Sequence, residues 1–396
     1  MDPRLSPRTI VATYVGTVVG AAFASGQEIL QFFGYFGAWG LAGLLLTTVL
    51  FILFGYLIME GGHRLEARSY RAVIMEAGGP WLGRALDGVV TFFLFGALLI
   101  MAAGAGAFFR QHFGLPFALG SAAMVVAAAA TVLAGLGGVI AAISIIAPAL
   151  LLGALGLGAY TVISAWPGTS GGFFWSLPQE APVPSWPLSS VLYASYNLLL
   201  AVAVLAPIGP RARRKDLWLG ALGGGTALGL AATSIFLALM AQGRAGAASE
   251  LPMLAVAARL GPLVAWSYGL ILLAEIYTTA VSSLFGFASR LGTEGARFRL
   301  AVSAAGAAAF ILAQFGFSVL VGTILPAVGY AGLLFLGALA LGYRPLREAW
   351  PRVARLVAAP HPLRKAFPRG RVVEKEPHGN APKNGQEAPR DESPRR

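Results

Sequence analysis

The chain has 396 residues, of which 57% are hydrophobic and 12% are charged, with a net charge of +12 and no cysteine. A soluble domain has about 25% charged residues, so this composition excludes a soluble globular protein. The absence of cysteine excludes disulfides, thiolate metal sites and cysteine nucleophiles. The basic excess lies in short loops and in the C-terminal tail, as expected for cytoplasmic segments beside anionic lipid. We therefore expect lipid contacts and no nucleic-acid partner.

About ten membrane spans are expected, because one span needs about 20 apolar residues and several uncharged runs are long enough for two. Their approximate limits are 8–33, 36–60, 84–110, 117–135, 138–165, 188–209, 216–241, 262–289, 299–315 and 324–343. We expect the transmembrane domain to cover residues 1–345. The segment 346–396, poor in apolar residues, is predicted to be a basic and largely disordered tail.

The loop charges predict the topology. Arginines gather between spans two and three, six and seven, and eight and nine, whereas the loop 166–187 has no Lys or Arg and contains three Trp. By the positive-inside rule both termini are cytoplasmic in a multi-pass cell-membrane protein. On the outer side, the segment 249–260 is too short to span and is predicted to be an amphipathic helix.

The first span contains the most unusual stretch, GTVVGAAFASGQE at 16–28, with glycine at 16, 20 and 26. Such a weak helix is tolerated in a membrane only where it faces protein or a wet cavity. We expect the helix to break here, with carbonyls at the end of its inner half facing a cation and amides at the start of its outer half facing a substrate carboxylate. The alternative is close helix packing through small residues.

The sixth span carries the polar run Tyr193-Ala-Ser-Tyr196-Asn197. Two interrupted helices at equivalent places in two halves are typical of inverted-repeat transporters. We therefore predict repeats 8–165 and 188–343, of opposite orientation because each holds five spans, with helices one and six both broken.

Two acids, Glu28 and Glu275, lie well inside predicted spans and away from their first and last turns. An acid at mid-bilayer costs at least ~2.5 kcal/mol, so Glu28 and Glu275 are expected to pair, to take up a proton or to help hold a cation. The alternative is that these two acids have only a structural role in the fold. In the eighth span, Thr279 shares a helix face with Ser282 and Ser283. Their hydroxyls are candidate ligands for a small hard cation, or they bond the carbonyls of their own helix.

Enzyme chemistry is not expected. The sequence contains no phosphate-binding loop, no Ser/His/Asp order, no paired catalytic carboxylates and no histidine spacing typical of a metal site. We predict no cofactor other than a candidate sodium ion.

The motif at 16–28, with the following Ile-Leu-Gln-Phe-Phe at 29–33, resembles the YkvI family of bacterial membrane proteins. The runs 193–197 and 324–330 agree with that resemblance, which covers most of residues 8–343. The family is similar to the amino acid–polyamine–organocation superfamily, which implies a five-plus-five inverted repeat of the LeuT type and a bacterial cell membrane. The resemblance also implies a sodium site made by Gly16 and Val19 with Thr279, Ser282 and Ser283.

The sequence thus predicts a secondary transporter of an amino acid or a related small solute, coupled to sodium or to protons. The expected substrate-binding residues are Thr17, Gly20, Ala21, Ser25, Gly26, Gln27, Tyr193, Tyr196 and Asn197. The expected coupling residues are Gly16, Val19, Glu28, Glu275, Thr279, Ser282 and Ser283. The alternatives are a non-transporting receptor or scaffold of the same fold, like germination-receptor subunits, and a channel; the oligomeric state is left open.

Overall fold

A computed structural model of the protein describes residues 5–67, 69–134, 181–242, 249–291 and 295–342, with isolated positions at 153, 156, 157 and 160. Within these residues all regular secondary structure is helical, and eight helices are long and apolar enough to cross a membrane. The predicted all-α membrane protein is therefore confirmed. Most of the predicted fifth span and all of the predicted tail 346–396 lie outside the described residues.

The first predicted span is broken, and it forms three helices: α1 (Pro7–Val18), α2 (Ala21–Ser25) and α3 (Gln27–Phe32). Ser6 caps the start of α1, where its hydroxyl accepts a hydrogen bond from the amide of Thr9 at 3.3 Å. The chain becomes extended at Val19 and Gly20, which ends α1. A second interruption at Gly26 has a φ of 81°, a left-handed conformation that favours glycine.

The remaining helices follow the predicted order. They are α4 (Trp39–Arg64), α5 (Tyr70–Phe108), α6 (Phe117–Ala134), α8 (Trp186–Ile208), α9 (Arg214–Gln242), α11 (Pro252–Leu260), α12 (Pro262–Leu291), α13 (Gly295–Ala313) and α14 (Phe317–Gly342). Helix α11 lies within the segment 249–260 that was predicted to form an amphipathic helix. Helix α5 begins well before the predicted limit near 84, and it bends at Gly79, whose φ is positive, just before Pro80.

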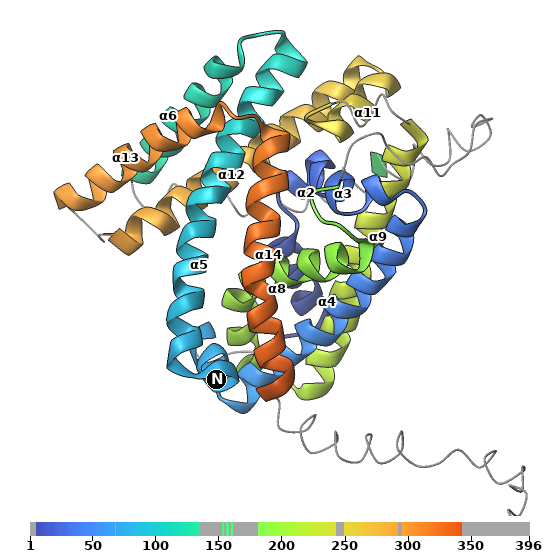
Figure 1. Ribbon diagram of the computed structural model, residues 1–396, viewed down its shortest axis with the longest axis vertical. Coiled ribbons are helices and arrows are strands. Elements are labelled where there is room, and N and C mark those ends of the chain that lie inside the picture. The colour runs from blue at the N-terminus through green and yellow to red at the C-terminus, as the bar shows by residue number, and fades with distance from the viewer. Residues whose placement is uncertain are drawn as a thin grey trace, which may run out of the picture. The chain divides into compact units, whose positions relative to one another are not determined.

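The helices pack as two groups. Helix α1 contacts α8 and α9, which also pack with α4, while α5 contacts α6 and α12, and α13 packs with α6 and α12. Among the described helices, α1, α4, α5 and α6 contact α8, α9, α12 and α13 respectively, which is the pairing expected of the predicted repeats. Helix α14 runs beside both α5 and α8 (Figure 1). The short helix α2 contacts α5 and α12, so the break joins the two groups.

The predicted break in the sixth span is wrong, because α8 is one continuous helix from Trp186 to Ile208. The reason is chemical. The stretch 186–208 contains no glycine, and the side chain of Asn197 donates a 2.9 Å hydrogen bond to the carbonyl of Tyr193 in its own preceding turn. The polar residues therefore stay within a regular helix, and the break in the first span has no equivalent in α8.

The left-handed turn at Gly26 provides a test of the fold. A methyl group at Gly26 would contact the side chain of Met253 and would also strain a backbone with a φ of 81°. We expect Gly26→Ala to lower the free energy of unfolding by about 1–2 kcal/mol, measured by denaturation in mild detergent. Gly20→Ala is the control, because a methyl group there meets open space and the backbone is extended. Equal stability of the two variants would contradict this reading of the turn.

Candidate functional site

A cavity of about 560 Å³ lies at the break between α1 and α2. Its walls come from the first span, α5, α8 and α12, with Leu325 of α14. Most of the predicted site residues line it: Gly16, Thr17, Val19, Gly20, Ala21, Glu28, Tyr196, Asn197, Glu275, Thr279, Ser282 and Ser283. The structure therefore brings residues from three separate spans to one place.

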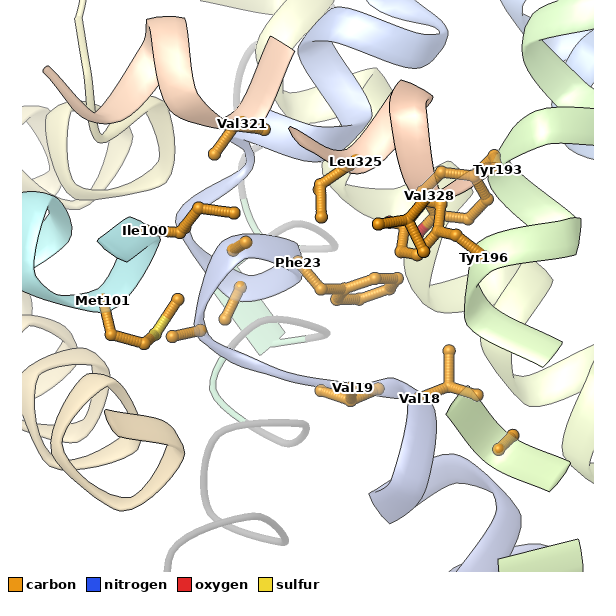
Figure 2. Packing of buried hydrophobic residues seen from close by; sticks show 14 of the residues in the cluster. Val18, Val19, Phe23, Ile100, Met101, Tyr193, Tyr196, Val321, Leu325 and Val328 are labelled. Carbon is orange, nitrogen blue, oxygen red and sulfur yellow. The ribbon is translucent and has the colours of Figure 1, made fainter. Parts of the chain in front are cut away.

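The end of α1 exposes backbone oxygens to this cavity. Figure 2 shows the extended segment that carries Val19, with Phe23 of α2 pointing toward Tyr196 and Val328. Within the described residues, no hydrogen-bond donor reaches the carbonyl oxygens of residues 16–19. Residues 16–19 also line the cavity, so free carbonyls lie at its wall.

The other two pieces of the first span end differently. The hydroxyl of Ser189 donates a 2.7 Å hydrogen bond to the carbonyl of Phe32 at the end of α3. The hydroxyl of Tyr268 donates to the carbonyl of Ala24 near the end of α2. Side chains of α8 and α12 thus occupy orphan carbonyls that a helix end leaves without partners, and the carbonyls at the end of α1 are left for a ligand.

Glu28 lies on the opposite wall and is only 7% exposed. Its carboxyl oxygen accepts a 2.6 Å hydrogen bond from the hydroxyl of Tyr196. Tyr196 packs edge-on against Tyr193, whose ring also contacts Phe32 and Phe33. The aromatic cluster therefore holds the Tyr196 hydroxyl that orients the Glu28 carboxyl.

Helix α12 contributes a polar face. Thr278 and Ser282 donate to the carbonyls of Glu275 and Thr279 in their own helix, at 3.1 and 3.0 Å. Of the three predicted hydroxyls, only that of Ser282 thus bonds its own helix. The hydroxyls of Thr279 and Ser283 also line the cavity, and they have no hydrogen-bond partner in the part of the chain that the structure describes. These two hydroxyls are therefore available to a ligand.

Four predicted site residues do not line the cavity: Ser25, Gly26, Gln27 and Tyr193. The Ser25 hydroxyl donates to the carbonyl of Ala22 at 2.8 Å, and accepts from the amide of Gln27 at 3.2 Å, which supports the turn at Gly26. The side-chain amide of Gln27 donates to the hydroxyl of Ser318 in α14 at 2.7 Å. These residues shape the turn and the packing around the site.

Gln31 joins the same contact. Its side-chain amide donates to the carbonyl and to the hydroxyl of Ser318, at 2.7 and 3.1 Å. Gln31 and Gln27 stand one helical turn apart on α3, and both are almost completely buried. The two glutamines thus join α3 to α14.

The cavity extends the other way to Tyr70 and Arg290, which line it near the ends of α5 and α12. Arg290 forms an ion pair with Asp87 at 3.1 Å and donates to Thr91 at 2.8 Å, and its side chain is 25% exposed. The Tyr70 hydroxyl also donates to Asp87, at 3.0 Å. The sequence reading missed this network and the apolar wall of α5, because a uniformly apolar span gives no signal of which face lines a cavity.

No family model matches the chain. It is 30% identical over 346 residues to the membrane protein YkvI of Bacillus subtilis (strain 168), which covers 87% of this chain and 98% of that protein. It is also 29% identical over 278 residues to the protein YyaD of the same organism, covering 70% of this chain and 79% of that protein.

Three solved structures share the fold. The complex of MhsT with L-phenylalanine aligns with a TM-score of 0.56 and 20% identity, covering 85% of this chain and 90% of that one. A Na⁺-coupled sialic acid symporter in a substrate-bound outward-open state aligns with a TM-score of 0.58 and 14% identity, covering 86% of this chain and 79% of that one. The nucleobase–cation symporter Mhp1 aligns with a TM-score of 0.53 and 15% identity, covering 87% of this chain and 80% of that one. These likenesses show that the fold is that of LeuT-type transporters.

The hydrogen bond between Tyr196 and Glu28 can be tested by a double-mutant cycle. We expect Tyr196→Phe and Glu28→Gln to show a coupling free energy of about 0.5–3 kcal/mol for unfolding in detergent, because the two side chains contact each other. Tyr277→Phe is the matched control, since its hydroxyl bonds Thr131 instead, and we expect it to be additive with Glu28→Gln. Additivity of the first pair would contradict the proposed contact.

Proposed function

This chain belongs to the YkvI family of membrane proteins, and from that membership and its LeuT-type fold we propose that it is a secondary active transporter of a small organic solute. The observation that carries the proposal is the cavity at the break of the first span, between the two helix groups. Broken helices that face a polar cavity at mid-membrane are typical substrate sites in such transporters.

The two ends of the site differ in a way that supports alternating access. On one side the cavity reaches Arg290, which is partly exposed. On the other side Gln27 and Gln31 of α3 are buried against Ser318 of α14. We propose that this conformation is open toward the arginine-rich side, which the positive-inside rule places in the cytoplasm together with both termini. The opposite conformation would separate α3 from α14.

The coupling ion is proposed to bind beside α12. Free carbonyls at Gly16 and Val19 and free hydroxyls of Thr279 and Ser283 line one cavity, and oxygen ligands of this kind suit a small hard cation. Ser282 would contribute less, because its hydroxyl donates to the carbonyl of Thr279. Sodium is the proposed ion. The alternative is a proton carried by Glu28 or Glu275.

The substrate is proposed to bind between the first span and α8. Thr17, Gly20 and Ala21 line the same cavity as Tyr196 and Asn197. A volume of about 560 Å³ lies within the ~300–1,000 Å³ of small-molecule sites, so an amino acid or a related solute can be held. Ser25, Gly26, Gln27 and Tyr193 are assigned to the support of this site and not to contact with substrate.

Sodium binding is tested by thermal unfolding of the purified protein in sodium chloride against potassium chloride. We expect sodium to stabilise the wild type, by about 1.4 kcal/mol at a concentration tenfold above its Kd. Ser283→Ala should reduce this shift, because it removes a free hydroxyl ligand. Ser267→Ala is the control on the same helix, where the side chain is exposed and does not line the cavity. An unchanged sodium shift in Ser283→Ala would count against the cation site.

Alternating access is tested with single-cysteine variants, which need no background substitution because the chain has no cysteine. Val204 lies in the cavity wall and is 37% exposed, whereas Gln31 is 4% exposed beside α14. We expect conditions that slow maleimide labelling of Val204→Cys, such as added sodium and solute, to speed labelling of Gln31→Cys. Exposed Ser267→Cys should label at a constant rate.

Parallel changes at both cysteines would contradict alternating access. The same preparation in proteoliposomes should show saturable uptake of solute driven by a sodium or proton gradient. Solute binding without any uptake would favour the receptor or scaffold interpretation, and continuous conduction would favour a channel.

A further inference from the structure

We propose that the solute carries a protonated amino group and that Glu28 binds it. This inference rests on the proposed function, because it concerns the substrate of the same cavity. It begins from the charges on the cavity wall. Two carboxyl groups line the cavity, Glu28 and Glu275, and each side chain is 7% exposed.

Neither carboxyl group has a basic partner in the described residues, where the ion pairs involve other acids. Among the described residues that line the cavity, Arg290 is the one basic residue, and it is paired with Asp87. The fifth span, which the structure describes at only a few positions, cannot supply the missing charge, because the sequence from 114 to 179 contains no Lys, Arg, Asp or Glu. Within the described residues, the wall therefore holds two acids that have no counter-charge.

The charge of these acids determines which class of solute the cavity can bind. A buried carboxylate is costly unless it is paired, hydrated or protonated. An anionic solute would add a like charge to a wall that already holds two acids, and it would find no free basic group there. A solute with an ammonium group instead provides the missing counter-charge and three hydrogen-bond donors.

The surroundings distinguish the two acids. Glu275 stands on α12 with the free hydroxyls of Thr279 and Ser283 and, across the cavity, the free carbonyls at the end of α1. Ser283 is 5% exposed and has no partner among the described residues, so a ligand is expected beside it. Glu275 thus belongs with the coupling cation.

Glu28 belongs with the solute. It lies with Tyr196 and Asn197, and the Tyr196 hydroxyl donates to one of its oxygens at 2.6 Å. That bond fixes the orientation of the carboxyl group and leaves acceptor capacity for an ammonium group. Phe93, Ile100 and Met101 line the facing wall on α5, so the body of the amine is expected to be apolar.

The test uses matched compounds with one body and three head groups. The first set is 2-phenylethylamine, 2-phenylethanol and 3-phenylpropanoate, and the second is 3-methylbutylamine, 3-methylbutanol and 4-methylpentanoate. Thermal unfolding of the full-length protein is measured in sodium buffer over a millimolar range of each compound. In at least one set, the amine should stabilise the protein at a concentration about tenfold or more below that of the alcohol and the carboxylate.

Substitutions then locate the binding group. Glu28→Gln should remove the preference for the amine, by about tenfold or more in relative Kd. Glu60→Gln is the matched control, because Glu60 is an equally buried acid that pairs with Arg214 outside the cavity, and it should keep the preference. If Glu28→Gln does not fold, Glu28→Asp replaces it and should show an intermediate preference, because its carboxylate is retained but withdrawn from the cavity.

Three results would overturn the proposal: no response to either amine, an alcohol or carboxylate that binds as well as its amine, or a full amine preference in Glu28→Gln. Uptake into proteoliposomes separates this proposal from the proposed function. If an amine binds but is never transported, the proposed amine site is supported and the proposed transporter function is contradicted. If only alcohols or carboxylates are transported, the proposed amine site is contradicted and the proposed transporter function is supported.

Discussion

The structure depends on one constraint, the cost of backbone groups without hydrogen bonds inside a membrane. Each such group in hydrocarbon costs several kcal/mol, so the extended backbone at Val19 and Gly20 can exist only between protein walls. The two helix groups supply those walls, with α8 on one side and α12 on the other. Ser189 and Tyr268 satisfy carbonyls of α3 and α2, and the carbonyls at the end of α1 face the cavity. A break in one helix thus creates both the cavity and its ligands.

The same low-polarity surroundings give the two acids their importance. Glu28 and Glu275 line one cavity without a basic partner in the described chain, whereas Glu60 and Asp87 are paired with arginines. The paired acids join helices to one another. The unpaired acids are left for whatever enters the cavity, and for that reason the proposed ion and the proposed amine are both cations.

The sequence predicted some elements of the site and not others, for identifiable reasons. Glycines at 20 and 26 predicted the break in the first span, because glycine is a weak helix former and readily adopts the left-handed conformation of residue 26. The same reasoning failed in the sixth span, where polarity was taken for a break. Asn197 satisfies its amide within its own helix, and with no glycine nearby α8 continues. The apolar face of α5 carried no signal, since every face of that span is apolar in sequence.

By itself, the sequence determined the class of the protein, the limits of most helices and the place of the first break, because the length of apolar runs and the position of glycines act locally. Only the tertiary structure decided which side chains meet. The left-handed turn at Gly26 redirects α3 after α2, so that neighbouring residues diverge: Gln27 reaches Ser318 on α14, whereas Glu28 reaches Tyr196 on α8. No spacing in the sequence could distinguish these two residues, since their roles depend on the helix that each one faces.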